Sequence, residues 1–129
     1  MTDKSPKKPT VLVVDDQPKV LKFMAIGLKL HGYDVITVGS GEEALEQVKE
    51  TNPDIMLLDI IMPGIDGFEV LRRVRSFSQM PVITFSASAD NHTEAIKLGA
   101  NDFVTKPFQP DYMVKRIEAL LGNDGHSAS

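Results

Sequence analysis

The hydrophobic residues of this chain fall into two patterns that alternate along the sequence. Short continuous apolar runs predict strands buried on both faces, whereas apolar residues spaced three and four apart predict amphipathic helices. The runs predict strands over residues 10–14, 33–38, 54–58, 82–85 and 102–105. Strands that alternate with helices pair in parallel and carry helices on both faces of the sheet. We therefore predict an α/β fold with a single, doubly wound, five-stranded parallel sheet.

Turn and capping residues set the limits of the helices. Proline is favoured in the first turn of a helix, and glycine just after its last turn. Helices are predicted from Pro18 to Gly32, over 42–50, from Asp66 through Phe77, over 90–98 as a short and weak helix, and between Pro110 and Gly122. No repeat or second domain is visible in the sequence. We expect a flexible leader at 1–9, one domain at 10–122 and a flexible tail at 123–129.

Size and composition restrict the class of protein. The chain has 129 residues, of which 42% are hydrophobic and 25% charged, as is usual for one globular domain. No apolar stretch approaches the roughly 20 residues of a membrane span, and the polar N-terminal residues form no secretory signal. We therefore expect a cytoplasmic protein with no membrane partner. The absence of cysteine excludes disulfides and thiolate ligands, and the formal net charge of −4 argues against direct nucleic-acid binding.

Two of the predicted strands lead into acidic residues. The run at 11–14 precedes Asp15 and Asp16, and the run at 55–58 precedes Asp59. If these strands are neighbours in a parallel sheet, the three carboxylates meet at one edge and repel one another unless a cation lies between them. Mg²⁺ prefers oxygen ligands and is usually held by one or two carboxylates together with a phosphate. The sequence therefore predicts a magnesium site at this edge.

Polar residues at two further strand ends extend the predicted site. Ser86 follows the fourth strand, and Lys106 follows the fifth strand directly before Pro107. Right-handed crossovers place helices on both faces only if the strand order reverses, and ligands bind there, beyond the carboxyl ends of the strands. A carboxylate at this point can attack a phosphoryl group while a lysine and a hydroxyl stabilise its oxygens. Asp59 is thus the predicted nucleophile.

The same residues also have structural interpretations. Asp16 stands just before the first predicted helix, where aspartate often acts as a cap. Taken singly, Asp59 and Ser86 are also typical of turns, and Lys106 of a solvated surface. Their grouping at one edge of the sheet favours the functional interpretation.

The segment 39–44 suggests a different ligand. It fits the dinucleotide-binding pattern G-x-G-x-x-A between a strand and a helix, with Asp59 placed as the acid that would bind the ribose. However, Glu42 and Glu43 put negative charges in the first helical turn, where a pyrophosphate needs free amides. This interpretation is disfavoured, and it leaves the other strand-end residues without a role.

Four segments resemble the receiver domains of bacterial two-component response regulators. They are VLVVDDQP, DIMLLDIIMPGIDGFEVL, PVITFSA and GANDFVTKPF, which occur in the order and spacing of that family over residues 10–121. The resemblance implies a flavodoxin-like (βα)5 fold with strand order 2-1-3-4-5. It also implies a cis peptide bond between Lys106 and Pro107.

The resemblance assigns roles to the acidic residues. It implies that Asp59 is the residue that becomes phosphorylated. It implies further that Asp15, Asp16, Asp59 and the backbone carbonyl of Ile61 bind Mg²⁺, for which Mn²⁺ can substitute. The protein would promote only its own phosphorylation and slow dephosphorylation, so it would not be an enzyme in the usual sense.

The resemblance also implies a switch and its partners. Ser86 would be the switch hydroxyl, Lys106 the ion-pair partner of the phosphoryl group, and Phe103 the aromatic residue whose rotamer follows activation. A sensor histidine kinase or a histidine phosphotransfer protein would donate the phosphoryl group. The signal would pass to a downstream protein or an output domain.

Three features of the sequence modify this picture. The segment 86–99 is shorter than is usual in the family, so the fourth helix should be short or displaced. Phe103 stands where tyrosine is frequent and therefore lacks a hydroxyl. Ile61 has no polar side-chain atom that could orient an attacking water, so we expect a long-lived phosphoryl group.

Two other functions compete with this one, a scaffold of the same fold and a hydrolase of the same layer type that acts on small molecules. A phosphorylation-independent interaction scaffold would lack an acid, the acceptor or the lysine, and this chain has all of them. Aspartyl-phosphate hydrolases resemble one another in having a second aspartate, the general acid, two residues after the nucleophile. This chain has Ile61 at that position. The sequence favours the phosphoacceptor over both.

Overall fold

The computed structural model describes residues 8–122, so the predicted tail and most of the predicted leader lie outside the described residues. The strands are β1 Thr10–Val14, β2 Asp34–Val38, β3 Ile55–Asp59, β4 Val82–Ser86 and β5 Asp102–Thr105. All of their pairings are parallel, in the order β2-β1-β3-β4-β5. The predicted sheet and its strand order are confirmed. The order reverses beside β1, which pairs with both β2 and β3.

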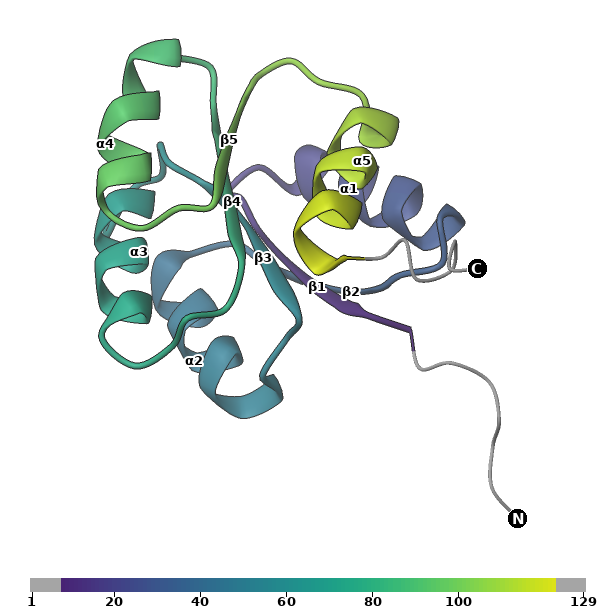
Figure 1. The fold of residues 1–129 in the computed structure, drawn as a ribbon, viewed down its shortest axis with the longest axis horizontal. Helices are drawn as coiled ribbons and strands as arrows, with labels where there is room; N and C mark the ends of the chain where they lie inside the picture. Colours follow the sequence, from purple (N-terminus) through teal and green to yellow (C-terminus); the bar gives the residue numbers. More distant parts are fainter. Residues whose placement is uncertain (1–7, 123–129) are drawn as a thin grey trace.

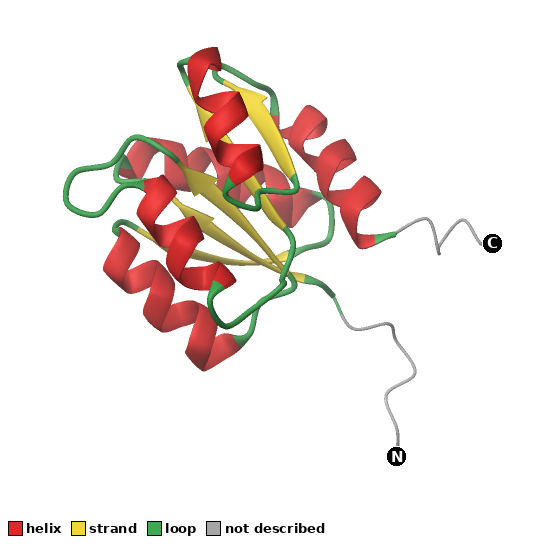
Figure 2. Cartoon of the chain, turned by 60° about the vertical axis from the view of Figure 1, so that its left-hand side comes forward, coloured by secondary structure: helices red, strands yellow, loops and turns green. Residues whose placement is uncertain are grey.

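Helices cover both faces of the sheet, as Figures 1 and 2 show. They are α1 Pro18–Leu30, α2 Gly41–Thr51, α3 Gly67–Arg75, α4 His92–Lys97 and α5 Pro110–Leu121, with a 3₁₀ turn, η1, at Ala89–Asn91. Helices α1 and α5 lie on one face, and α2, α3 and α4 lie on the other (Figure 1). Among the described helices, none combines the length and apolar character that a membrane crossing requires.

The strands have nearly continuous apolar sequences because both faces of the sheet are buried. In β1, Leu12 and Val14 face a core shared with α2 and α3, whereas Val11 and Val13 face a core shared with α1 and α5. All four side chains are inaccessible to solvent. This packing fixes which strand ends meet at the carboxyl edge.

Element limits differ from the prediction by one or two residues. Helix α3 ends at Arg75 rather than at Phe77, because the last amides bond to carbonyls three residues back, as Phe77 does to Val74 at 3.0 Å. Tyr33 lies outside β2, although its side chain is buried. Helix α4 has only 6 residues, which confirms the expected short fourth helix. The cis peptide bond before Pro107 is also confirmed.

Candidate functional site

The ends of β1 and β3 bring the three aspartates together. Val14 pairs with Leu58 in the parallel register, so Asp15 and Asp59 leave neighbouring strands at the same edge. One carboxylate oxygen from each of Asp15, Asp16 and Asp59 lies within 4.8 Å of the others. The predicted convergence of acidic groups is therefore confirmed.

Backbone amides hold two of these carboxylates in place. Asp15 is fully buried, and its Oδ1 accepts a hydrogen bond of 2.9 Å from the backbone N–H of Gln17. Asp59 is 3% exposed, and its Oδ1 accepts a bond of 3.2 Å from the N–H of Ile61. In both residues Oδ1 accepts a hydrogen bond from the backbone of the turn that follows the strand, and Oδ2 faces the ammonium of Lys106.

Asp16 has a different environment. The N-cap of α1 is Gln17, whose side chain makes no capping bond, so the interpretation of Asp16 as a helix cap is wrong. The Asp16 side chain is exposed, and its carboxylate has no hydrogen bond or ion pair with any other described residue. The site therefore contains one solvent-facing carboxylate whose oxygens are available to a ligand.

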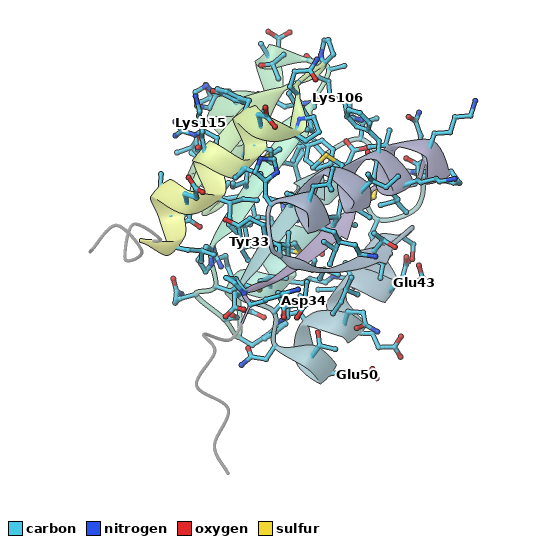
Figure 3. The ribbon with its side chains drawn as sticks, turned by 90° about the vertical axis from the view of Figure 1, so that its right-hand side faces the viewer. Tyr33, Asp34, Glu43, Glu50, Lys106 and Lys115 are labelled. Carbon is cyan, nitrogen blue, oxygen red and sulfur yellow. The ribbon has the colours of Figure 1, made fainter. Side chains whose placement is uncertain are left out.

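Lys106 supplies the positive charge of the site. Its Nζ lies 3.3 Å from Asp15 Oδ2 and 3.5 Å from Asp59 Oδ2. The ammonium also lies 5.2 Å from the ring centroid of Phe85, in a cation–π contact. Figure 3 shows Lys106 in the upper part of the view and Asp34, which begins β2, in the lower half. The interpretation of Lys106 as a free surface lysine is wrong.

The electrostatics of Asp59 reflect this crowding. Burial raises its pKa from 3.8 to about 6, and the neighbouring charge of Asp15 raises it as well, while Lys106 and the Ile61 amide oppose the shift. Three carboxylates face one ammonium, so negative charge is in excess. An oxygen-rich cluster with excess negative charge, in which the Asp16 carboxylate is unpaired among the described residues, fits a hard divalent cation such as Mg²⁺ or Mn²⁺.

Ser86 ends β4 with its side chain buried. Its Oγ accepts hydrogen bonds from Asn91 Nδ2 at 2.8 Å and from the backbone N–H of Ser88 at 3.1 Å. The backbone N–H of Lys106 donates to the carbonyl of Ser86 at 2.8 Å, so the two predicted site residues leave adjacent strands together. The contact with Asn91 was not predicted, since nothing in the sequence indicates where that amide points.

Phe103 lies in β5, opposite Thr84 in the register with β4. Its half-buried ring stacks on the imidazole of His92, with centroids 5.2 Å apart and planes inclined by 12°. This contact was also missed, because it joins two residues that the sequence placed in separate elements.

The loop after β3 is shaped by one glycine. A Cβ atom at Gly67 would lie 2.4 Å from the backbone oxygen of Asp59 and 2.6 Å from Ile60 Cα, so only glycine fits there. Asp66 caps α3 by accepting the Glu69 amide at 3.0 Å, as the sequence predicts. The Ile61 side chain is 58% exposed at this loop, and the role of its carbonyl as a metal ligand stays a prediction.

The alternative of a dinucleotide site at 39–44 is wrong. Ser40 Oγ caps α2 by accepting the Glu43 amide at 3.2 Å, and Glu43 Oε1 accepts the Gly39 amide at 3.0 Å. These amides are the groups that a pyrophosphate would need. A Cβ at Gly41 would lie 2.5 Å from Ile65 Cγ1, so this glycine serves helix packing.

Comparison with known proteins agrees with this geometry. Residues 11–118 match the family model of the response regulator receiver domain. The chain is 39% identical to the DNA-binding response regulator MtrA of Mycolicibacterium smegmatis over 113 residues, which are 86% of this chain and 50% of MtrA. The chain thus spans about half the length of the curated relatives it matches.

Solved structures show the same similarity. The receiver domain of the Francisella response regulator 1452 has a TM-score of 0.84 and 34% identity, covering 90% of this chain and 98% of that chain. The BeF3-activated N-terminal receiver domain of Klebsiella pneumoniae RstA has a TM-score of 0.81 and 31% identity, covering 85% and 96% respectively.

Proposed function

This chain belongs to the response regulator receiver domain family, and on that premise we propose that Asp59 is the residue that accepts the phosphoryl group. Receiver domains are the phosphoacceptors of two-component signalling, so the reaction class follows from the family. The observation that carries the assignment is the position of Asp59 within ion-pair distance of Lys106 and beside the carboxylates of Asp15 and Asp16.

The proposed reaction is transfer from a phosphohistidine. An oxygen of Asp59 attacks phosphorus, and the new O–P bond forms as the N–P bond breaks, with the electron pair leaving on the imidazole. With its pKa raised to about 6, Asp59 is still mostly ionised at pH 7 and can act as the nucleophile. Lys106 Nζ, at 3.5 Å from Asp59 Oδ2, is placed to stabilise negative charge on the transferred group.

We propose that Asp15, Asp16, Asp59 and the backbone carbonyl of Ile61 hold a divalent cation, Mg²⁺ or Mn²⁺. Three carboxylates facing one ammonium, with Asp16 unpaired among the described residues, support this assignment. When bound, the ion would offset the negative charge of the phosphoryl oxygens. The two buried carboxylates are already oriented by backbone amides, so little reorganisation is needed to bind it.

The switch proposed for this domain uses Ser86 and Phe103. The phosphoryl group carries a charge of about −1.5 to −2, which attracts the Ser86 hydroxyl towards the phosphoryl oxygens. The space that Ser86 leaves allows the Phe103 ring to move inward. The resulting change at the surface of β5 is the proposed output signal.

We propose that a sensor histidine kinase or a histidine phosphotransfer protein is the donor. The relative MtrA is described as DNA-binding, and this chain corresponds to about half of that protein. The output of the present domain is proposed to act through a protein partner or an output domain rather than by direct contact with nucleic acid, in keeping with its net charge of −4.

The test is incubation with acetyl phosphate, with and without Mg²⁺, followed by intact mass measurement. The wild type should gain one phosphoryl group only with Mg²⁺. Asp34→Asn is the control and should behave like the wild type, because Asp34 begins β2 and the site lies beyond the carboxyl ends of the strands (Figure 3). Asp59→Asn should gain none. Labelling that persists in Asp59→Asn, or that needs no divalent ion, would overturn the proposal.

A further inference from the structure

The first turn of α4 contacts both residues of the proposed switch. Asn91 and His92 are consecutive, and they lie where η1 passes into α4. Asn91 binds Ser86, and His92 stacks on Phe103. Two neighbouring side chains therefore hold two residues that belong to different strands, β4 and β5.

The Asn91 side chain is directed at Ser86 rather than at its own helix. Asn91 occupies the N-cap position of α4 but makes no side-chain capping bond. Its Nδ2 donates instead to Ser86 Oγ at 2.8 Å, and Ser86 is 1% exposed. A buried hydroxyl that leaves this position must give up the bond with Asn91, so the bond opposes the proposed movement.

The His92 side chain likewise opposes movement of Phe103. The two rings are nearly parallel, and their centroids are 5.2 Å apart. Since His92 is exposed whereas Phe103 is half-buried, the stack covers the outer side of the phenyl ring. Inward movement of Phe103 would break the stack.

Helix α4 is suited to move as a unit. It has 6 residues and a single buried side chain, Ala95, so few packing contacts hold it. The turn after it is fixed, because Arg75 Nε donates to the Gly99 carbonyl at 3.0 Å and Arg75 Nη2 donates to Asn101 Oδ1 at 3.0 Å. The helix is thus anchored at its C-terminal end, while Asn91 and His92 tie its N-terminal end to the switch. Figure 2 shows the helix lying over the strands at one side of the sheet, where α4 contacts β5.

We propose that Asn91 and His92 are positioning residues that hold Ser86 and Phe103 in the unphosphorylated arrangement. The first turn of α4 then couples the two switch residues, since release of one contact shifts the turn that makes the other. This inference rests on the proposed function of Asp59. It predicts that loss of either contact favours the activated state.

The test is a titration of the whole chain with beryllofluoride and Mg²⁺, which together mimic the phosphoryl group, followed by amide chemical shifts. Each contact is of a kind that contributes about two- to tenfold to an equilibrium, so Asn91→Ala and His92→Ala should each bind beryllofluoride tighter by about that factor. Asn91→Leu, which fills more of the same space without a donor, should repeat the effect of Asn91→Ala. Thr93→Ala is the matched control, because Thr93 is exposed in the same turn and, among the described residues, makes no hydrogen bond to Ser86 and no ring contact with Phe103.

The outcomes separate this inference from the proposed function. If the wild type does not bind beryllofluoride, or if Asp59→Asn still binds it, the assignment of Asp59 fails. If the wild type binds but either contact variant is no tighter than Thr93→Ala, the positioning role is overturned. A merely structural role cannot produce the expected result, because general loss of stability, measured by urea unfolding, would weaken binding or leave it unchanged.

Discussion

Asp15 and Asp59 share one counterion, the ammonium of Lys106, which lies 3.3 Å from an oxygen of Asp15 and 3.5 Å from an oxygen of Asp59. Both carboxylates are buried, whereas 25% of the lysine side chain is exposed. One positive charge therefore has to balance two buried negative charges. The stability of the domain and the reactivity of Asp59 both depend on that imbalance.

Removal of this counterion should destabilise the domain strongly. Lys106→Met keeps most of the side-chain volume but leaves two buried carboxylates without a cation, a change that typically costs about 3–5 kcal/mol. The loss should be largest at pH 7 and smaller near pH 4, where the Asp59 carboxyl, whose pKa is raised to about 6, is protonated in the folded protein. Lys115→Met, on the exposed face of α5, should stay within about 0.5 kcal/mol of the wild type. Urea unfolding at both pH values measures the difference, and equal losses for the two variants would contradict the shared ion pair.

The raised pKa of Asp59 predicts an unusual pH dependence of stability. Because the folded-state pKa of about 6 lies above the ordinary value of 3.8, the folded protein binds more protons than the unfolded chain between these values. This contribution therefore lowers the free energy of unfolding as pH rises through that window. In metal-free buffer, Asp59→Asn should exceed the wild type in stability by about 1–3 kcal/mol at pH 7.

The same comparison has an internal control. The stability advantage of Asp59→Asn should shrink as the pH falls from about 6 to 3.8 and approach zero only below 3.8, where the wild-type carboxyl becomes protonated in both states. Groups remote from residue 59 cancel in the difference. An advantage that is independent of pH would point to packing rather than to charge.

The site acids could be predicted because their positions depend only on strand ends. Parallel strands with continuous apolar sequence deliver the residues that follow them to one edge, so Asp15, Asp59 and Lys106 were found from the pattern alone. The strand order 2-1-3-4-5 was predicted from the family resemblance. The magnesium site was predicted from the preference of Mg²⁺ for oxygen ligands. The alternative at 39–44 shows the limit of short motifs, since the same residues here cap the start of α2.

The contacts of Asn91 and His92 could not be predicted in this way. They depend on the direction of side chains in a short helix whose start is set by a 3₁₀ turn. A helix with one buried residue has almost no periodic signal to fix its rotation. The close approach of Gly67 to Asp59 likewise depends on a loop path, which glycine permits but does not specify.

Asp16 should bind metal without contributing to the stability of the metal-free protein. Its exposed carboxylate has no partner among the described residues, so Asp16→Asn should change the free energy of unfolding in EDTA by less than about 0.5 kcal/mol. Mg²⁺ at 100 times its Kd should stabilise the wild type by about 2.7 kcal/mol, and Asp16→Asn should lose much of this at the same concentration. Asp34→Asn should keep the full effect, and a Mg²⁺ response in Asp16→Asn equal to that control would remove Asp16 from the site.

Gly67 should be required for the shape of the site. An added Cβ would lie 2.4 Å from the Asp59 carbonyl oxygen, so Gly67→Ala must displace the backbone beside the proposed acceptor. We expect a loss of about 1–3 kcal/mol in stability and slower labelling by acetyl phosphate. Gly39→Ala is the matched control near the same edge, because the atoms nearest to its new Cβ would lie at an ordinary contact distance of 3.9 Å. Normal labelling of Gly67→Ala would contradict the close fit.

The exposed side chain of Ile61 should prolong the life of the phosphoryl group. It lies at the loop beside Asp59, 58% exposed, and carries no atom that could orient an attacking water. Ile61→Asn places an amide there, and correct orientation of a water should shorten the lifetime on the order of tenfold. Release of inorganic phosphate from acetyl-phosphate-labelled protein measures the rate.

Ile26→Asn is the matched control, because Ile26 is 53% exposed on α1 and the chemical change is identical. Its phosphoryl lifetime should equal that of the wild type, so any general effect of a new surface amide is removed by the comparison. If Ile61→Asn and Ile26→Asn release phosphate equally slowly, water is oriented by another group or by none, and the lifetime does not depend on this position. Faster release of phosphate from Ile61→Asn alone would show that hydrolysis depends on the side chain at position 61, whose backbone N–H donates to Asp59 Oδ1 at 3.2 Å.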